Sequence, residues 1–207
     1  MALLEKSPNK TVQTGAALCL SKIIQNSPEE VLIELLGEMT DRIIAVTKLT
    51  SFKAPTPLLE CIISIVFHVE LDFAPFVPRL IPMLIDFINN DEWSTKKVAI
   101  DAVYSIAAIL KEQILPFRVD ILKVLANCRF DKVKPVREAT TETIKLLKEI
   151  SPPLDDKQLS ELIQGTKPKK PDNRSGSGNR IIKKQFAEGP ISDESEVREK
   201  KFGRRQP

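Results

Sequence analysis

The sequence predicts an all-α chain: an α-solenoid of helical hairpins followed by a disordered C-terminal tail. Apolar residues recur at three- and four-residue spacing in four segments of residues 1–150, which is the period of amphipathic helices. These segments return at a nearly constant interval along the chain. Strands are poorly supported, because the β-branched residues fall within helical patterns and Asn-Gly or Asp-Gly hairpin turns are absent.

The repeated unit is a pair of helices. Taking Val12, Ala54, Thr95 and Val136 as equivalent gives steps of 42, 41 and 41 residues. The four segments are KTVQTGAALCLSKII, FKAPTPLLECIISIV, WSTKKVAIDAVYSIA and VKPVREATTETIKLL, and the partner helices between them are PEEVLIELLGEMTDRIIAVTKL, APFVPRLIPMLIDFI and PFRVDILKVLANC. Two helices in about 41 residues are typical of HEAT-type repeats, so residues 1–150 are predicted to form a HEAT-repeat solenoid.

Two features of the sequence predict where helices begin and where one is interrupted. Ser27 precedes Pro28 and two glutamates, which predicts an N-cap serine with proline at the first helical position. Pro78 and Pro82 lie inside APFVPRLIPMLIDFI, where each removes a backbone donor and clashes with the preceding turn. We therefore expect this helix to be bent or broken at the two prolines.

The C-terminal part of the chain has a different composition. Residues 1–150 hold 18 basic and 19 acidic residues, whereas 151–207 hold 13 and 9. LDDKQLSELIQG predicts a short capping helix within 151–165 that ends at Gly165. Residues 166–207 are predicted to be basic and mostly disordered, because they offer little to bury. Their main cationic cluster is Lys167, Lys169, Lys170, Arg174, Arg180, Lys183 and Lys184.

Several classes of function find no support in the sequence. No run of eighteen uncharged apolar residues and no cleavable leader is visible, which predicts a cytoplasmic chain without a membrane partner. Cys19, Cys61 and Cys128 are far apart in helical patterns, which favours reduced core thiols over disulfides or a metal cage. His68 has no nucleophile at a recognisable spacing, and no phosphate-binding loop appears. We expect a non-enzyme that needs no cofactor or metal.

Basic residues recur where each hairpin turns. Because every hairpin turns on the same edge of a solenoid, these residues should line up along that edge. In order, the residues along this edge are Lys10, then Ser51, Phe52 and Lys53, then Trp93, Lys96 and Lys97, then Arg129, Lys132, Lys134 and Arg137, so that every step contains at least one basic residue. Cations at helix N-termini are mildly unfavourable, by a few tenths of a kcal/mol, roughly. Another interaction must therefore favour them.

Two interpretations of this basic edge stay open. Asp91 and Asp131 lie in the same connectors, so ion pairs between neighbouring repeats would give Lys97 and Arg137 a structural role. Alternatively, the exposed helix N-termini and the lysines of the edge form a positive stripe suited to an acidic partner. Trp93, the only tryptophan, either anchors an interface or packs over the end of its own hairpin.

The segments VQTGAALCLSKII, SFKAPTPLLECIISIV, DEWSTKKVAIDAVYSIA and RFDKVKPVREATTETIKLLKEI resemble successive repeats of the plant Tortifolia/Spiral microtubule-associated proteins. The HEAT arrays of that family are related to the tubulin-binding TOG domains, and the resemblance covers roughly residues 8–150. The resemblance implies a tubulin-binding module in which the edge where the hairpins turn faces tubulin. Carried over residue by residue, it selects Phe52, Lys53, Trp93, Lys96, Lys132 and Lys134.

This sequence departs from the family pattern at two places. The family array has further repeats N-terminal to this region, whereas Met1 here falls just before a second helix that lacks its own first helix. We therefore expect either a shortened array or a partner protein that covers the unpaired helix. Pro55 and Pro57 directly follow SFKA, which makes Lys53 a weaker candidate than Lys96 or Lys132.

The sequence thus favours a structural protein of the cytoskeleton that binds tubulin through its connectors. The basic tail would add weak contacts to acidic tubulin segments or would only solvate a linker. The alternative is a generic HEAT scaffold for another protein complex. Nucleic acid is a less favoured partner, because the basic cluster lacks interleaved aromatic residues. Free tubulin, the microtubule lattice and an axonemal array all stay open as targets.

Overall fold

Residues 1–150 are described by the computed structural model of the protein, and they form an all-α solenoid as the sequence predicts. The predicted capping helix at 151–165 and the predicted disordered tail at 166–207 lie outside the described residues. Residues 1–150 contain no strand. The elements are α1 (Ala2–Lys6), α2 (Lys10–Asn26), α3 (Glu29–Thr47), α4 (Pro55–Val69), the 3-10 helix η1 (Glu70–Phe76), α5 (Val77–Ile88), α6 (Trp93–Ile109), α7 (Lys111–Ile114), the 3-10 helix η2 (Leu115–Phe117), α8 (Arg118–Cys128) and α9 (Lys134–Glu149).

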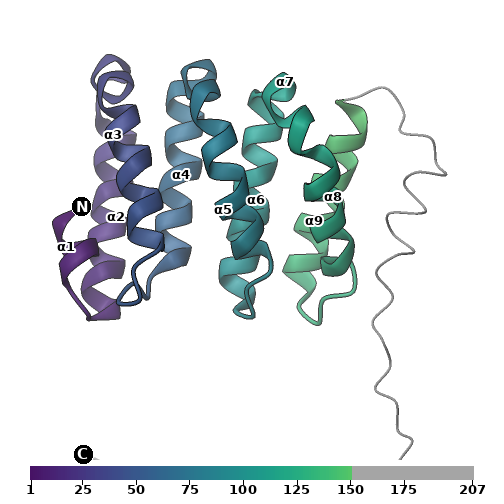
Figure 1. Ribbon diagram of the computed structural model, residues 1–207, viewed down its shortest axis with the longest axis horizontal. Helices are drawn as coiled ribbons and strands as arrows, with labels where there is room; N and C mark the ends of the chain where they lie inside the picture. The colour runs from purple at the N-terminus through teal and green to yellow at the C-terminus, as the bar shows by residue number, and fades with distance from the viewer. Residues whose placement is uncertain (151–207) are drawn as a thin grey trace, which may run out of the picture. The chain divides into compact units, whose positions relative to one another are not determined.

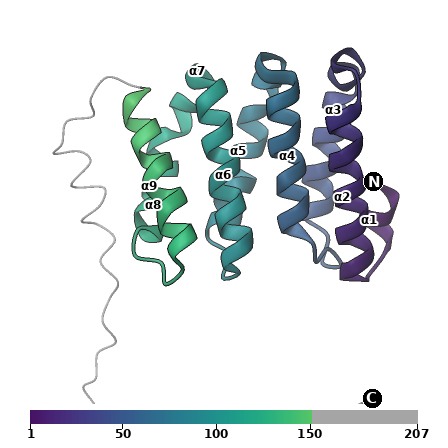
Figure 2. The same cartoon turned by 180° about the vertical axis from the view of Figure 1, so that it is seen from behind.

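The helices form two layers, visible from opposite sides in Figures 1 and 2. The second helices of successive hairpins, α2, α4, α6 and α9, pack side by side in one layer. The first helices, α3, α5 and α8, form the other layer, and each packs against the second helix that follows it. α1 occupies the first-helix position beside α2. The hairpin of about 41 residues is therefore the structural unit, as the sequence predicts.

Apolar side chains from the facing sides of the two layers form a continuous core. α4 illustrates the periodicity, because Leu58, Ile62, Ile65 and Val69 recur every three or four residues and are all buried. Fully burying a side chain of this size contributes about 2 kcal/mol. α4 also buries Leu59, Cys61 and Val66. It is apolar over most of its circumference because α2 and α6 flank it within its own layer while α3 and η1 also contact it.

The burial of α4 also explains one apolar stretch of the chain. By length and composition alone, Pro55–Ile88 is apolar enough to cross a membrane. In the structure this stretch comprises α4, η1 and α5, with Glu70 and Asp72 exposed at the joint. Because α4 and α5 bury their apolar side chains in the solenoid core, their composition is that of core helices.

Three expectations about local structure need correction. The helix predicted to stand unpaired, α2, has a short partner in α1, whose Leu4 is completely buried. Pro78 lies in the first turn of α5, where a missing N–H breaks no helical bond, and the helix continues through Pro82 to Ile88. The interruption lies earlier, at η1. Ser27 does not cap α3, because its hydroxyl donates instead to the Ile23 carbonyl of α2 (2.7 Å).

The cysteine expectation is partly wrong. Cys61 and Cys128 are buried thiols, but Cys19 is exposed on α2. Burial raises the pKa of Cys61 to about 12, and it also raises the pKa of Cys128. Cys19 is open because α2 is the first described helix of its layer and has no neighbour on that side among residues 1–150.

Candidate functional site

The turns of the three complete hairpins lie at one edge of the solenoid, which is the lower edge in Figure 1. We call this the connector edge and define it by residues 48–54, 89–92 and 129–133, with the first turn of the helix after each. The connections between hairpins lie at the opposite edge, at residues 27–28, at η1 and at α7 with η2. The structure therefore brings the three predicted connectors to one side of the molecule.

The first connector is fixed by a buried glutamine. Gln13 of α2 is completely buried, and its side-chain amide donates to the carbonyls of Ser7 (2.7 Å) and Ser51 (3.0 Å). Its Oε1 accepts a hydrogen bond from the Lys53 backbone N–H (2.8 Å). Phe52 packs against the core, whereas the Lys53 side chain is exposed. The connector is thus held in one conformation, with a lysine directed to solvent.

The second connector is fixed by its own polar side chains. The Asn90 side chain accepts a hydrogen bond from the Glu92 N–H (2.8 Å). The Glu92 carboxylate accepts hydrogen bonds from the hydroxyls of Ser94 and Thr95, both at 3.1 Å. The contacts of Glu92 join side chains of the turn to one another and cap no backbone N–H of the first turn of α6. Trp93, the first residue of α6, lies between these anchors and is 50% exposed.

The third connector is held by an ion pair between repeats. Lys96 Nζ of α6 lies 2.8 Å from Asp131 Oδ2, and the two side chains are only 18% and 15% exposed. Asp131 Oδ1 accepts a hydrogen bond from the Val133 N–H (2.9 Å). The Lys96 hydrogen bond, and then the Val133 N–H, hold the pKa of Asp131 below its ordinary value. Arg137 donates to the Asp131 carbonyl (2.7 Å) and braces the same turn.

Two interpretations of the basic residues were left open by the sequence: ion pairing between repeats and contact with an acidic partner. The structure shows the ion pairing between repeats at a different lysine from the one that the sequence suggested. The pairing between repeats that the sequence suggested for Lys97 is made by Lys96, which the resemblance selected as a tubulin contact. Lys97 pairs instead with Asp101 of its own helix (2.5 Å). The difference arises because helical residues 100° apart face different neighbours. Arg137 has the structural role that the sequence suggested, although it acts within its own connector.

The remaining selected residues differ in their exposure. Lys53, Lys132 and Lys134 are exposed. Lys134 pairs with Glu138 at 3.1 Å in a solvated contact, whereas Lys53 and Lys132 form no ion pair with any residue of 1–150. Phe52 is only partly accessible because it packs on the core. The selected tail residues Lys167, Lys169, Lys170, Arg174, Arg180, Lys183 and Lys184 lie outside the described residues.

Sequence reasoning missed Phe130. It stands in the third connector, between Arg129 and Asp131, and 84% of its surface is exposed. The signal was present in the sequence, because an aromatic residue directly before a polar turn has no helical neighbours to pack against. Together, Phe130 and Trp93 place two accessible aromatic rings on adjacent connectors, beside Lys132 and Lys134. Such a combination suits a protein surface that is both apolar and acidic.

The described residues include no candidate metal site, and the histidine among them has a backbone partner. No group of three His, Cys, Asp or Glu side chains within 1–150 could hold a metal ion. The His68 Nε2 atom lies 3.0 Å from the Ser27 carbonyl, so its ring bridges α4 and the end of α2.

Comparisons with known proteins place residues 1–149 in a family and identify relatives in one plant. The family model described as TORTIFOLIA1 N-terminal matches residues 1–149. TORTIFOLIA1-like protein 2 of Arabidopsis thaliana is 31% identical over 159 residues, which cover 77% of this chain and 19% of that protein. Microtubule-associated protein TORTIFOLIA1 of the same plant is 28% identical over 186 residues, covering 87% of this chain and 21% of the relative. TORTIFOLIA1-like protein 4 of the same plant is 31% identical over 145 residues, which cover 69% of this chain and 23% of that protein. The chain therefore spans about a fifth of the length of these relatives.

Proposed function

Because the chain belongs to the TORTIFOLIA1 N-terminal family, we propose that it is a microtubule-binding protein of the cytoskeleton whose connector edge contacts tubulin. One relative is named a microtubule-associated protein. None of the comparisons points to an axonemal array. The observation that carries the proposal is the pair of exposed aromatic residues, Trp93 and Phe130, on adjacent, internally anchored connectors.

The aromatic pair supplies what a protein interface needs at its centre. Exposed Trp and Phe rings cost free energy in water and become favourable when a partner buries them. Here the backbone beneath the rings is already fixed, by Asn90 and Glu92 in one connector and by Asp131 in the other. Little conformational entropy is then lost on binding, which favours affinity.

The lysines supply the electrostatic part. Lys53, Lys132 and Lys134 are exposed along the connector edge and would attract an acidic tubulin surface, with an effect that added salt screens. Lys96 belongs to the support of the third connector, because it is mostly buried against Asp131. The proposed contact set is therefore Lys53, Trp93, Phe130, Lys132 and Lys134.

Microtubule co-sedimentation of a variant carrying Trp93→Ala and Phe130→Ala tests the aromatic part. We expect at least a tenfold loss of affinity, since truncating a central aromatic anchor typically costs about 2 kcal/mol or more. Phe67→Ala is the matched control, because Phe67 is 58% exposed near the far end of α4, away from the connectors. Circular dichroism should be unchanged in both variants. Equal pelleting of the double variant and the control would contradict the proposal.

A second experiment tests the charges. Lys53→Glu with Lys132→Glu should weaken co-sedimentation and flatten its dependence on salt. Lys111→Glu, at the exposed start of α7 on the opposite edge, should leave both unchanged. If Lys111→Glu weakened binding as much as the connector variant, net charge rather than the connector edge would be responsible. The contribution proposed for the tail is separated by replacing its seven basic residues with glutamine in the same assay.

A further inference from the structure

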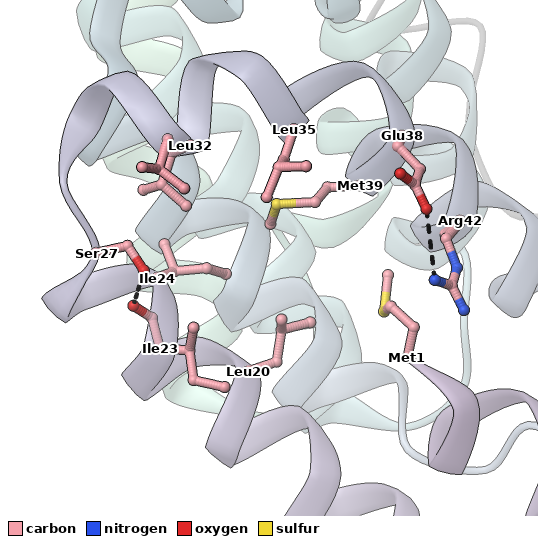
Figure 3. A pocket seen from close by; sticks show the side chains of 11 residues that line it. Met1, Leu20, Ile23, Ile24, Ser27, Leu32, Leu35, Glu38, Met39 and Arg42 are labelled. Atoms are coloured by element: carbon pink, nitrogen blue, oxygen red, sulfur yellow. Dashed lines mark hydrogen bonds and ion pairs between the residues drawn. The ribbon is translucent and has the colours of Figure 1, made fainter.

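Exposed apolar side chains also lie outside the connector edge. Some of them line a groove of about 240 Å³ between α2 and α3, shown in Figure 3. The two charged residues of the groove, Glu38 and Arg42, pair with each other at 3.6 Å, and Ser27 is the other polar residue that lines it. The groove therefore presents no net charge that would select a partner. The edge opposite the connectors is different, because its exposed apolar residues stand beside unpaired charges.

We call this opposite edge the junction edge and define it by residues 27–30, 67–76 and 111–117, at the top of Figure 1. Phe67, in the last turn of α4, is 58% exposed, and Leu71 of η1 is 69% exposed. The carboxylates of this edge are exposed and form no ion pair with any residue of 1–150. They are Glu29, Glu30, Glu70, Asp72 and Glu112.

Glu70 lies between Phe67 and Leu71 and has a strained backbone. It is the C-cap residue of α4, with φ 41° and ψ −111°. Glycine adopts a positive φ without strain, whereas a residue with a Cβ does so at a cost in free energy. A glycine here would relieve the strain but would remove a carboxylate from between the two exposed apolar side chains. Strained residues of this kind cluster at functional sites.

The two edges of the solenoid carry opposite charge. The connector edge, as defined above, contains seven basic and three acidic residues, whereas the junction edge contains one basic and five acidic residues. Because the same hairpins form both edges, their charged groups recur with the same repeat spacing. The junction edge is thus both apolar and acidic. A surface of that kind is what the aromatic rings and lysines of the connector edge suit.

We propose that the connector edge of one copy binds the junction edge of a second copy. The two edges of one copy cannot meet, because they lie at opposite ends of helices such as α6, whose 17 residues span about 26 Å. Lysines of the connector edge face the junction carboxylates, and the exposed apolar side chains of both edges are buried. This self-association occupies the edge that we propose for tubulin and therefore competes with microtubules. Only the competition rests on the proposed function.

Two full-length charge-reversal variants test this arrangement. The connector variant carries Lys53→Glu and Lys132→Glu, and the junction variant carries Glu70→Lys and Asp72→Lys, all at exposed positions. Sedimentation velocity in reducing buffer follows molecular mass against concentration. The wild-type mass should rise beyond the dimer, because each bound copy leaves one edge of either kind free. Added salt should lower it, because salt screens the charges.

Each variant alone should stay at the mass of one chain, because one of its edges has lost the charge that the other needs. The equimolar mixture should associate again, at least to a one-to-one dimer. The junction variant retains an intact connector edge for this contact, and the connector variant retains an intact junction edge. Lys22→Glu with Lys123→Glu makes the same change of net charge as the connector variant, at exposed positions outside both edges, and should associate as wild type does.

A wild-type chain that is monomeric at every concentration would overturn the proposal, and so would a mixture that fails to associate. Association of the connector variant alone would also overturn it, by placing another basic part of the chain on the junction edge. Because tubulin is absent from this assay, its failure would not bear on the tubulin contact, which co-sedimentation tests separately.

Discussion

Equivalent positions of the first repeat and the later repeats meet different surroundings. Gln13 of α2 and Lys96 of α6 occupy the same repeat position and have the same task, since each reaches the connector of the next hairpin. Gln13 does so with neutral hydrogen bonds and is completely buried. Lys96 does so with a charged pair that keeps some solvent contact. The connector of the next hairpin is thus held by neutral hydrogen bonds in one repeat and by an ion pair in another. Only the contribution of the ion pair to stability should depend on pH.

A second pair shows the effect of position in the array. Cys19 of α2 and Cys61 of α4 are separated by one repeat. Cys61 is nevertheless buried, and it donates its thiol hydrogen to the Ala17 carbonyl of α2 (3.1 Å). Cys19 is exposed, because α2 has no preceding layer neighbour within the described part of the chain. The repeat fixes where a residue stands on its helix, and the neighbouring repeats fix how deeply it is buried.

Thiol reactivity should show the largest difference between the repeats. Only the thiolate is alkylated, and a pKa raised from 9.0 to about 12 lowers the thiolate fraction of Cys61 by about a thousandfold at neutral pH. We expect iodoacetamide to modify Cys19 in the native chain and to spare Cys61 and Cys128. Mass spectrometry of peptides from a timed reaction measures this. Equal modification of Cys19 and Cys61 in folded protein would show that the two positions do not differ.

Gln13→Ala should have the next largest effect. The substitution leaves the part-buried Ser51 carbonyl and Lys53 N–H without their side-chain partner, and an unsatisfied polar group costs about 1–3 kcal/mol when it is fully buried. We expect a loss of about 2–4 kcal/mol in the free energy of unfolding by urea. Gln25→Ala, at an exposed position of the same helix, is the control and should change stability little. A loss of stability no larger than in the control would mean that the Gln13 hydrogen bonds do not stabilise the first connector.

Asp131→Asn should cost about 1–2 kcal/mol at neutral pH, because it removes the charge from a hydrogen bond with Lys96. The wild-type contribution depends on pH. The folded pKa of Asp131 lies below its ordinary value of 3.8, so this stability is fully present above 3.8 and is lost as the pH falls through the folded pKa. When urea unfolding is measured at a series of acidic pH values, the free energies of unfolding of wild type and variant should therefore converge as the pH falls. A constant gap between them would exclude the ion pair as its cause.

Glu138→Gln should have the smallest effect. It removes the pair between Lys134 and Glu138, whose side chains are 74% and 57% exposed. Exposed pairs of this spacing contribute about 0.3–0.5 kcal/mol and are screened by salt. We expect urea unfolding to detect a change of this size at most. A loss as large as that of Asp131→Asn would mean that the solvated pair and the mostly buried pair contribute equally to the free energy of unfolding.

Most of the fold could be predicted from the sequence, because the signal repeats. Four helical segments at steps of 41 or 42 residues predict hairpins, layers and the common edge of their connectors. The candidate site could be predicted only in part. Trp93, Lys53, Lys132 and Lys134 are exposed at the predicted edge, whereas Lys96 is mostly engaged by Asp131. Which lysine of an adjacent pair reaches a neighbouring repeat depends on rotation about the helix axis, which periodicity specifies only loosely.

The sequence by itself determined the all-α class, the hairpin period and the edge on which basic and aromatic residues gather, because these follow from local periodicity and from connector composition. Only the tertiary structure decided that Phe130 is almost fully exposed, that Cys19 and Cys61 differ, and that α1 leaves a groove beside α2. Burial is a property of neighbours, and residues that are neighbours across repeats lie about forty positions apart in the chain.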